Sequence, residues 1–291
     1  MVRHHLLLPD VATRRDLDDL ATIESVADAV GSRDLLDLLA ALAEADGLAT
    51  GAAAWSEWKA GLIAELVRRV AATLDGSRTD PAPGLVERYA DGFAAGGTSV
   101  TVAESLDLVV VMTRDVPGLL WRVAGALALH RLDVRSATVA SAGGIAVQEI
   151  AVSPAPGSTP QVARVADDVR RALEGRLAIE SRLAERARAY ARPAAVPPEP
   201  PRLIVDNDAS RDATVIEVRA ADEVGVLYRI ARALSDCALD VRSAKVSTLG
   251  HEVVDTFYVV EADGAKVTHA LHLAEIERAV IDQLRTAAQQ P

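Results

Sequence analysis

Residues 108–152 read LVVVMTRDVPGLLWRVAGALALHRLDVRSATVASAGGIAVQEIAV, and residues 215–259 read VIEVRAADEVGVLYRIARALSDCALDVRSAKVSTLGHEVVDTFYV. The two stretches align without a gap at an offset of 107 residues, and 18 of the 45 aligned positions are identical. Self-similarity at a fixed offset indicates that one structural unit has been copied within the chain. The fold, and we expect the function, therefore depend on a pair of related units.

The first copy shows a sequence of alternating strand and helix patterns. An apolar run at residues 106–112 predicts a buried strand, and apolar residues at three- and four-residue spacing from Leu119 onwards predict a helix. Pro117 fits the first helical position, where a missing N–H group has no cost. Residues 132–140 and 145–152 predict two further strands, which the Gly-Gly turn between them would join as a hairpin.

A helix follows the hairpin in both copies. Residues 160–190 have a helical pattern with a break at Gly175, and residues 268–286 close the second copy. Strand, helix, hairpin and helix make up most of a ferredoxin-like βαββαβ sandwich, but no strand follows either final helix. Residues 99–103 and 202–206, which precede the two copies in the sequence, can supply the missing strand. We therefore predict an α+β fold with a ββαββα order in each copy, in which the leading strand takes the fourth sheet position.

The chain before the repeat is helical throughout. Residues 19–31, 32–47 and 53–74 carry three helical patterns, with Gly31 as a stop and Ser32 as an N-cap. Three such helices make a thin core, so the segment looks like half a domain. The expected organisation is a helical segment at 1–78, a linker at 79–98, a first repeat domain at 99–191, a Pro-rich linker at 192–201 and a second repeat domain at 202–291.

Composition excludes several classes of protein. The formal net charge of −11 argues against binding to nucleic acid, which requires a basic face. The single cysteine, Cys237, cannot form an internal disulfide and fits a reducing compartment. No apolar run approaches the length of about 20 residues that a membrane span needs. We therefore expect a cytoplasmic protein that binds neither nucleic acid nor membranes.

Two turns of the repeat could bind a small anionic ligand. A helix that starts at Gly118-Leu119 or at Gly225-Val226 offers backbone N–H groups and the positive end of its dipole to a carboxylate. Asp115 or Asp222 could receive an α-ammonium group at the same place. The alternative is structural, with glycine permitting a tight turn and aspartate capping the helix.

The two sites differ in sequence. Glu223 would place a like charge near a ligand carboxylate in the second copy, so the first site is the preferred one. The equivalent residues Arg135 and Arg242 are interpreted as solvated charges rather than contacts between the copies, and His130 and Cys237 as core or near-core residues.

Both copies resemble ACT domains, small modules that bind amino acids and regulate enzymes. The family pattern is a strand, an Asp-Arg-Pro-Gly turn and a helix. Asp115, Pro117 and Gly118 match it in the first copy, where Val116 replaces the arginine. Asp222 and Gly225 match it in the second, where glutamate and valine replace arginine and proline.

The first segment carries a second resemblance. VRHHLLLPDVATRRDLDD, LAEADGLAT and WSEWKAGLIAEL are similar to the final part of the HD metallophosphohydrolase domain in the bifunctional uridylyltransferase/uridylyl-removing enzymes, which modify the nitrogen signal protein PII. Asp46 matches the last acidic ligand of that family's divalent metal, and His4 or His5 would lie beside the site. On spacing alone these three residues have solvated or capping roles. The upstream His and His-Asp ligands are absent, so we expect no metal, no cofactor and no catalysis in this chain.

The resemblance implies a regulatory function. The chain would be the glutamine-sensing, C-terminal portion of a PII nucleotidyltransferase, with glutamine or another amino acid as ligand, PII as partner and the ACT domains as a route to homo-oligomers. Two alternatives remain open: a free-standing ACT-repeat protein that binds amino acids or oligomerises, and a metal-dependent HD phosphohydrolase. The sequence leaves uridylyl and adenylyl chemistry undecided in the parent enzyme.

Overall fold

The computed structural model describes residues 4–51, 55, 57–76, 85–89, 97–190, 199–246, 248–249 and 252–288. The chain forms two compact units. The first comprises Met1–Ala82 with Asp208–Arg211, and the second comprises Pro83–Asn207 with Asp212–Pro291.

The first unit contains the helices α1 (Leu7–Arg14), α2 (Leu20–Val30), α3 (Arg33–Thr50) and α4 (Glu57–Leu74). The three predicted helices correspond to α2, α3 and α4, whereas α1 was not predicted. It is short, with Pro9 in its first turn, where proline is tolerated. Its amphipathic face buries Leu8 and Ala12, which are 1% and 0% exposed.

Local capping fixes the helix ends in this unit. Gly31 ends α2 in a left-handed conformation with a φ of 71°, and the Ser32 side chain accepts a hydrogen bond from the Leu35 N–H at the start of α3. Both roles were predicted and are confirmed. The unit has its own apolar core, to which Leu8, Leu36 and Leu66 contribute. Leu6 stays 47% exposed, and the side chain of Trp58 lies outside the described residues.

The second unit is built on one nine-stranded antiparallel sheet. Its strands, in chain order, are β1 (Ser99–Val102), β2 (Leu108–Arg114), β3 (Leu132–Ala142), β4 (Ile145–Pro154), β5 (Arg202–Asp206), β6 (Thr214–Ala221), β7 (Asp240–Lys245), β8 (Thr248–Leu249) and β9 (Glu252–Val260). The order across the sheet is β1-β2-β4-β3-β7-β9-β6-β5, with β8 paired to β9. The leading strands β1 and β5 pair with β2 and β6, and Leu203 lies opposite Val218. The predicted ββαββα order is therefore confirmed.

The two copies meet edge to edge through equivalent residues. Ala137 of β3 pairs with Ala244 of β7, and these positions differ by the repeat offset of 107. Both strands carry a register shift at equivalent places, Val134/Ser136 and Val241/Ser243. Antiparallel pairing of an element with its own copy through the same residue requires a two-fold relation. An approximate two-fold axis therefore passes through this pair, and every contact near it should occur twice.

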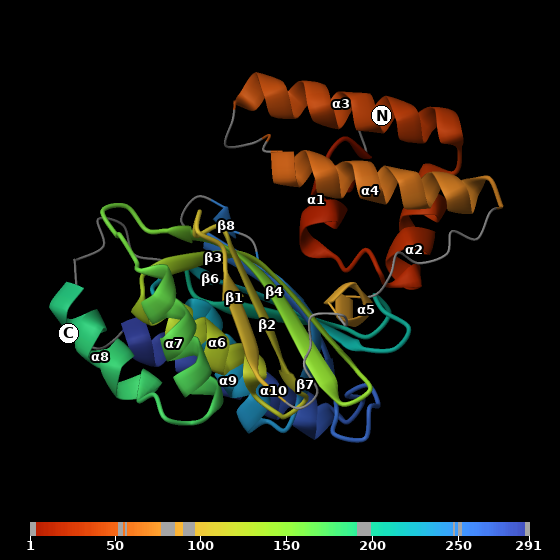
Figure 1. Ribbon diagram of the computed structural model, residues 1–291. Helices are drawn as coiled ribbons and strands as arrows, with labels where there is room; N and C mark the ends of the chain where they lie inside the picture. Colours follow the sequence, from red (N-terminus) through yellow and green to blue (C-terminus); the bar gives the residue numbers. More distant parts are fainter. Residues whose placement is uncertain are drawn as a thin grey trace. The chain divides into compact units, whose positions relative to one another are not determined.

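Helices cover one face of the sheet: α6 (Leu119–Leu129), α7 (Val162–Leu173), α8 (Ile179–Tyr190), α9 (Val226–Asp236) and α10 (Ala270–Ala288) (Figure 1). Gly175 separates α7 from α8 with a φ of 70°, as predicted. A single apolar core runs through both copies. At the two-fold axis, the equivalent side chains Trp121 and Tyr228 meet edge to face, with ring centroids 6.0 Å apart. Gly125 permits this contact, because a Cβ atom there would lie 2.8 Å from Cδ2 of Tyr228.

The short helix α5 (Leu85–Tyr89) packs on the other face of the first copy. Leu85 is buried beside Val110, Met112 and Val147. The Tyr89 hydroxyl donates a hydrogen bond of 2.6 Å to Oε2 of Glu149. Burial, together with this bond to a carboxylate, raises the pKa of Tyr89 to about 12. The contact fixes α5 to strand β4. No helix among the described residues is both long and apolar enough to cross a membrane.

Candidate functional site

The two-fold relation creates two clefts between the copies. The first cleft lies between the β2–α6 turn of the first copy and the start of β7 in the second. The second cleft lies between the β6–α9 turn and the start of β3. Residues Asp115, Val116, Gly118, Leu119, Gln148, Ser235, Leu239, Asp240 and Val241 are among those lining the first cleft. Leu132, Asp133, Val134, Asp222, Glu223, Val224, Gly225, Val226 and Tyr228 are among those lining the second.

A left-handed glycine begins the central helix at each cleft. Gly118 has φ 81° and ψ 19° as the N-cap of α6, and Gly225 has φ 78° and ψ 16° as the N-cap of α9. Such backbone angles favour glycine strongly. Because the N-cap residue of each helix is glycine, it has no side chain that could cap the helix start. Both turns therefore have the conformation that the sequence predicted for a carboxylate site.

Two details differ from the prediction. Pro117 is not the first helical residue, because α6 starts at Leu119 and the glycine before it supplies the N-cap. Proline instead precedes the N-cap, and it is not among the residues lining the first cleft. In the second copy, the N–H of Val226 donates to the carbonyl of Glu223 at 3.1 Å. The next N–H groups of α9 are therefore the donors that could reach a ligand.

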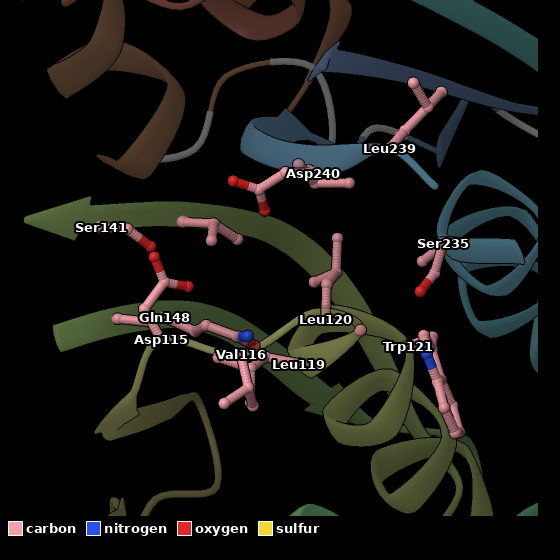
Figure 2. A pocket seen from close by; sticks show the side chains of 15 residues that line it. Asp115, Val116, Leu119, Leu120, Trp121, Ser141, Gln148, Ser235, Leu239 and Asp240 are labelled. Atoms are coloured by element: carbon pink, nitrogen blue, oxygen red, sulfur yellow. The ribbon is translucent and has the colours of Figure 1, made fainter. Parts of the chain in front are cut away.

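Aspartates from both copies face each cleft. In the first, Asp115 of one copy and Asp240 of the other point into the space between them (Figure 2). Burial raises the pKa of Asp240; Arg242 opposes this shift and the charge of Asp115 adds to it. In the second cleft, Asp222 and Asp133 occupy the equivalent positions. A pair of carboxylates with one raised pKa attracts a cationic group such as an α-ammonium.

Gln148 forms part of the wall of the first cleft. It lies on β4, is 1% exposed, and its amide nitrogen and oxygen have no hydrogen-bond partner within the described residues. Figure 2 shows it beside Asp115 and Val116. Unpaired buried polar groups are rare in folded proteins and call for an explanation. The equivalent residue of the second copy, Asp255, is not among those lining the second cleft.

The clefts differ in size. The first has a cavity volume of about 20 Å³ and the second about 200 Å³. One water molecule needs roughly 10–15 Å³ by this measure. The first cleft therefore has space for about one water molecule, whereas the second has space for a small organic molecule.

A partly buried cation pairs with a residue that lines the second cleft. Arg229 of α9 lies 2.9 Å from the Glu223 carboxylate and donates to the carbonyl of Val224 at 3.2 Å. Burial lowers the pKa of Arg229, and the charge of Glu223 opposes that shift. The negative charge expected to repel a ligand carboxylate is therefore compensated. Sequence analysis missed this pair, although Arg229 is one of the 18 identical positions and Glu223 is not.

The predicted site residues thus fall into two groups. Asp115, Gly118 and Leu119 line the first cleft, and Asp222, Gly225 and Val226 line the second. The partner aspartates from the opposite copy were missed, although the identical strings DVRSA at residues 133–137 and 240–244 carried the signal. The arginines of those strings, Arg135 and Arg242, stay 50% and 45% exposed beside an aspartate of their own strand.

The histidine and cysteine at the ends of the central helices also lie where expected. His130 is partly buried and bonds to Asp168 through Nε2 at 2.9 Å, whereas Cys237 is buried. Burial lowers the pKa of His130 and raises that of Cys237. Neither side chain lines the two clefts.

The residues matched to a metal site are not gathered into one. His4 is partly buried, and His5 and Asp46 are exposed. Within the described part of the chain, no group of three His, Cys, Asp or Glu side chains could hold a metal ion. These residues do not fit a metal by themselves, so no chemical step is derived through one.

Comparison with known proteins agrees with this architecture. Residues 209–287 match the model of the ACR family N-terminal ACT domain. The bifunctional uridylyltransferase/uridylyl-removing enzyme of Streptomyces coelicolor is 41% identical over 98% of this chain and 40% of its own length. The enzymes of the same name from Mycobacterium tuberculosis and Rhodospirillum rubrum are 38% and 34% identical over 97% and 96% of the chain, and over 37% and 36% of their own lengths.

The chain thus spans about two fifths of the length of these relatives. The matches include both the helical unit and the two copies of the repeat. Over nearly all of its length, the chain is therefore related to the C-terminal part of the bifunctional uridylyltransferase/uridylyl-removing enzymes, and it contains an ACT domain.

Proposed function

We propose that this chain is the amino-acid-sensing, regulatory portion of a PII-protein uridylyltransferase/uridylyl-removing enzyme. One observation carries the proposal: two clefts between the ACT copies each combine a helix start at a left-handed glycine with a pair of aspartates, one from each copy. That arrangement complements both charged ends of an α-amino acid. The relatives supply the uridylyltransferase/uridylyl-removing context. PII as the modified protein and glutamine as the ligand are part of this proposal.

In this proposal, the amino acid binds in the second cleft before it binds in the first. The second cleft, with its volume of about 200 Å³, needs no rearrangement to admit an amino acid. The ligand carboxylate would lie at the start of α9, and its ammonium group between Asp222 and Asp133. Arg229 removes the electrostatic objection to this site by pairing with Glu223. The first cleft would have to widen before it could hold the same ligand.

Regulation requires that the ligand prefer one arrangement of the copies. A preference of about 1–3 kcal/mol suffices for a 5- to 150-fold change in affinity elsewhere. Ligand contacts join a turn of one copy to a strand of the other, so binding would stabilise one relative placement of the two. This proposal also requires components that lie outside the described residues. They are the remaining part of the parent enzyme, a divalent metal at its hydrolase site, and the partner protein PII.

Calorimetry with glutamine tests the proposal directly. Titration of the purified chain should give saturable heat and a rise in melting temperature. The double variant Asp133→Asn/Asp222→Asn should abolish both signals, because the ammonium group loses its carboxylates. Asp167→Asn is the control, since Asp167 is exposed on α7 and lines neither cleft. Absence of heat with glutamine would refute glutamine sensing, and equal loss in both variants would refute the assigned site.

One observation favours a second candidate, an ACT-repeat protein that binds amino acids or oligomerises by itself. The helical unit has its own core, which includes Leu8, and so resembles a complete domain more than the sequence suggested. Light scattering at increasing concentration, with and without glutamine, separates the candidates. A ligand-dependent change in oligomeric state without any binding to PII would favour this second function.

A further inference from the structure

A third cavity, of about 550 Å³, lies on the first copy away from the two helix starts. It is formed by the end of α6, the segment before α7 and one face of α8. Its lining residues are Leu129, His130, Arg131, Ser158, Thr159, Pro160, Arg182, Glu185 and Arg186. Three arginines and one glutamate give this lining a formal charge of +2, although the whole chain carries −11. We name it the arginine pocket.

A buried aspartate holds part of this pocket in place. Asp168 of α7 accepts hydrogen bonds at 2.9 Å from His130 and at 3.0 Å from Arg171, and it lies 3.9 Å from Arg182. Burial lowers the pKa of His130; Asp168 opposes the shift, and Arg186 and Arg182 add to it. The positive charge of the pocket therefore comes from its arginines and not from the imidazole.

The two arginines of α8 present their charges together. Arg182 and Arg186 are four residues apart, so they share one face of the helix. Both side chains are only partly buried. Arg182 has its one carboxylate neighbour at 3.9 Å, and no ion pair of Arg186 is found among the described residues. Two guanidinium groups with remaining donors on one face match the oxygen atoms of a phosphate, which arginine binds in bidentate fashion.

The second copy does not repeat the side chains of this pocket. His130 and Arg131 correspond to Cys237 and Ala238 at the repeat offset. The backbone is the same at both places, since Arg131 and Ala238 have φ values of 55° and 58°. In the first copy, the helix α8 carries Arg182 and Arg186 over this corner. The two copies therefore have the same backbone at this corner, and the positive charge of the arginine pocket belongs to the first copy.

We propose that the arginine pocket binds a phosphate-bearing small molecule. The phosphate lies between Arg182 and Arg186 on α8 and the loop at Ser158 and Thr159. A dianion compensates the formal charge of the pocket, which a single carboxylate does only in part. Arg131 lines both this pocket and the second cleft, so the ligand borders a residue of the amino-acid site without sharing its aspartates.

Titration calorimetry at constant ionic strength tests this site. Inorganic phosphate, pyrophosphate and ATP are the three probes. At least one should give saturable heat and raise the melting temperature of the chain. Binding of phosphate alone identifies a single-phosphate ligand, and binding that tightens from phosphate to pyrophosphate to ATP identifies a nucleotide; both results support the site.

Charge-removing variants locate the ligand. Arg182→Ala and Arg186→Ala should each weaken binding about ten-fold or more, because each removes charge-assisted hydrogen bonds. Arg176→Ala is the matched control: Arg176 is 66% exposed beside Glu174 in the α7–α8 connection and does not line the pocket. Melting curves confirm that each variant is folded, and the two arginines give independent tests. No heat with any probe, or equal weakening by Arg176→Ala, overturns the proposal.

Discussion

The two clefts have the same main-chain conformation at their helix starts and differ in the side chains that fill them. Their glycine N-caps agree within a few degrees, yet the cavity volumes are about 20 and 200 Å³. At Gly118, a Cβ atom would meet Nε1 of Trp121 at 2.3 Å, whereas at Gly225 the nearest atom would be Cδ1 of Leu183 at 3.5 Å. The two copies thus keep the main-chain geometry of this turn, while side chains fill one cleft and leave the other open.

Substitution of the two glycines should give the largest difference. Gly118→Ala adds a left-handed alanine and a clash with Trp121, and should lower the free energy of unfolding by about 3 kcal/mol. Gly225→Ala adds only the backbone strain and should cost about 1 kcal/mol. Denaturant unfolding of both variants measures the two values. Equal costs would show that the first cleft is not closed by packing at its glycine.

The partly buried arginine of the second copy provides the next test. Arg229→Ala leaves Glu223 without its cation and should destabilise the chain by about 2 kcal/mol. The same substitution should also weaken the binding of an amino-acid ligand, because the uncompensated glutamate faces the ligand carboxylate. Arg122→Ala is the matched control at the equivalent position, where valine replaces the glutamate. Arg122 lies over the Trp121 ring at 5.1 Å, so its loss should cost about 0.5–1 kcal/mol.

Most of the fold could be predicted from the repeat. Periodicity gave the helices and strands, and the missing fourth strand identified β1 and β5 by elimination. Helix α1 was not predicted, because it is only eight residues long and carries a proline in its first turn, although its spacing is amphipathic. The helix start at Leu119 was displaced by two residues because glycine, and not proline, occupies the N-cap. Local propensities therefore place an element more reliably than its first residue.

The site could be predicted only in part. Each turn was recognisable within its own copy, but Asp133 and Asp240 reach the turns from the opposite copy. Their positions follow from the pairing of Ala137 with Ala244, a contact between residues 107 positions apart that no local pattern specifies. The volumes depend on which side chains pack against each glycine. Those contacts arise from tertiary structure and were not accessible to sequence analysis.

Gln148 offers a smaller test of the closed cleft. Its buried amide has no partner among the described residues, so Gln148→Leu should stabilise the unliganded chain by about 1 kcal/mol. Gln148→Glu is the control of opposite sign, because it buries a charge in the same space. Thermal and denaturant unfolding report both. If Gln148→Leu is destabilising, the amide already has a bridging water in the cavity of about 20 Å³.

Asp240 should give the smallest effect, and the dependence of that effect on pH identifies its cause. Burial, with Asp115 nearby, raises its pKa above the ordinary 3.8 in the folded chain, although Arg242 counteracts this. The folded state therefore binds this proton more readily than the unfolded state, and the charged form destabilises the fold at neutral pH. Asp240→Asn should consequently stabilise the chain at pH 7. The side chain is 39% exposed, so solvent screening limits the gain to about 0.5 kcal/mol.

The sign of the pH dependence distinguishes this cause from a general charge effect. As pH falls towards 3.8, Asp240 becomes protonated in the folded chain first, and the advantage of Asp240→Asn should disappear. Asp133→Asn is the control, because it removes the same charge at the equivalent, exposed position of the open cleft. Its effect on stability measures what the loss of one negative charge from a chain of net charge −11 contributes by itself. Unfolding curves between pH 4 and 7 measure both variants. Parallel pH profiles would mean that the facing aspartates of the closed cleft do not interact, which would remove the electrostatic basis for an ammonium site there.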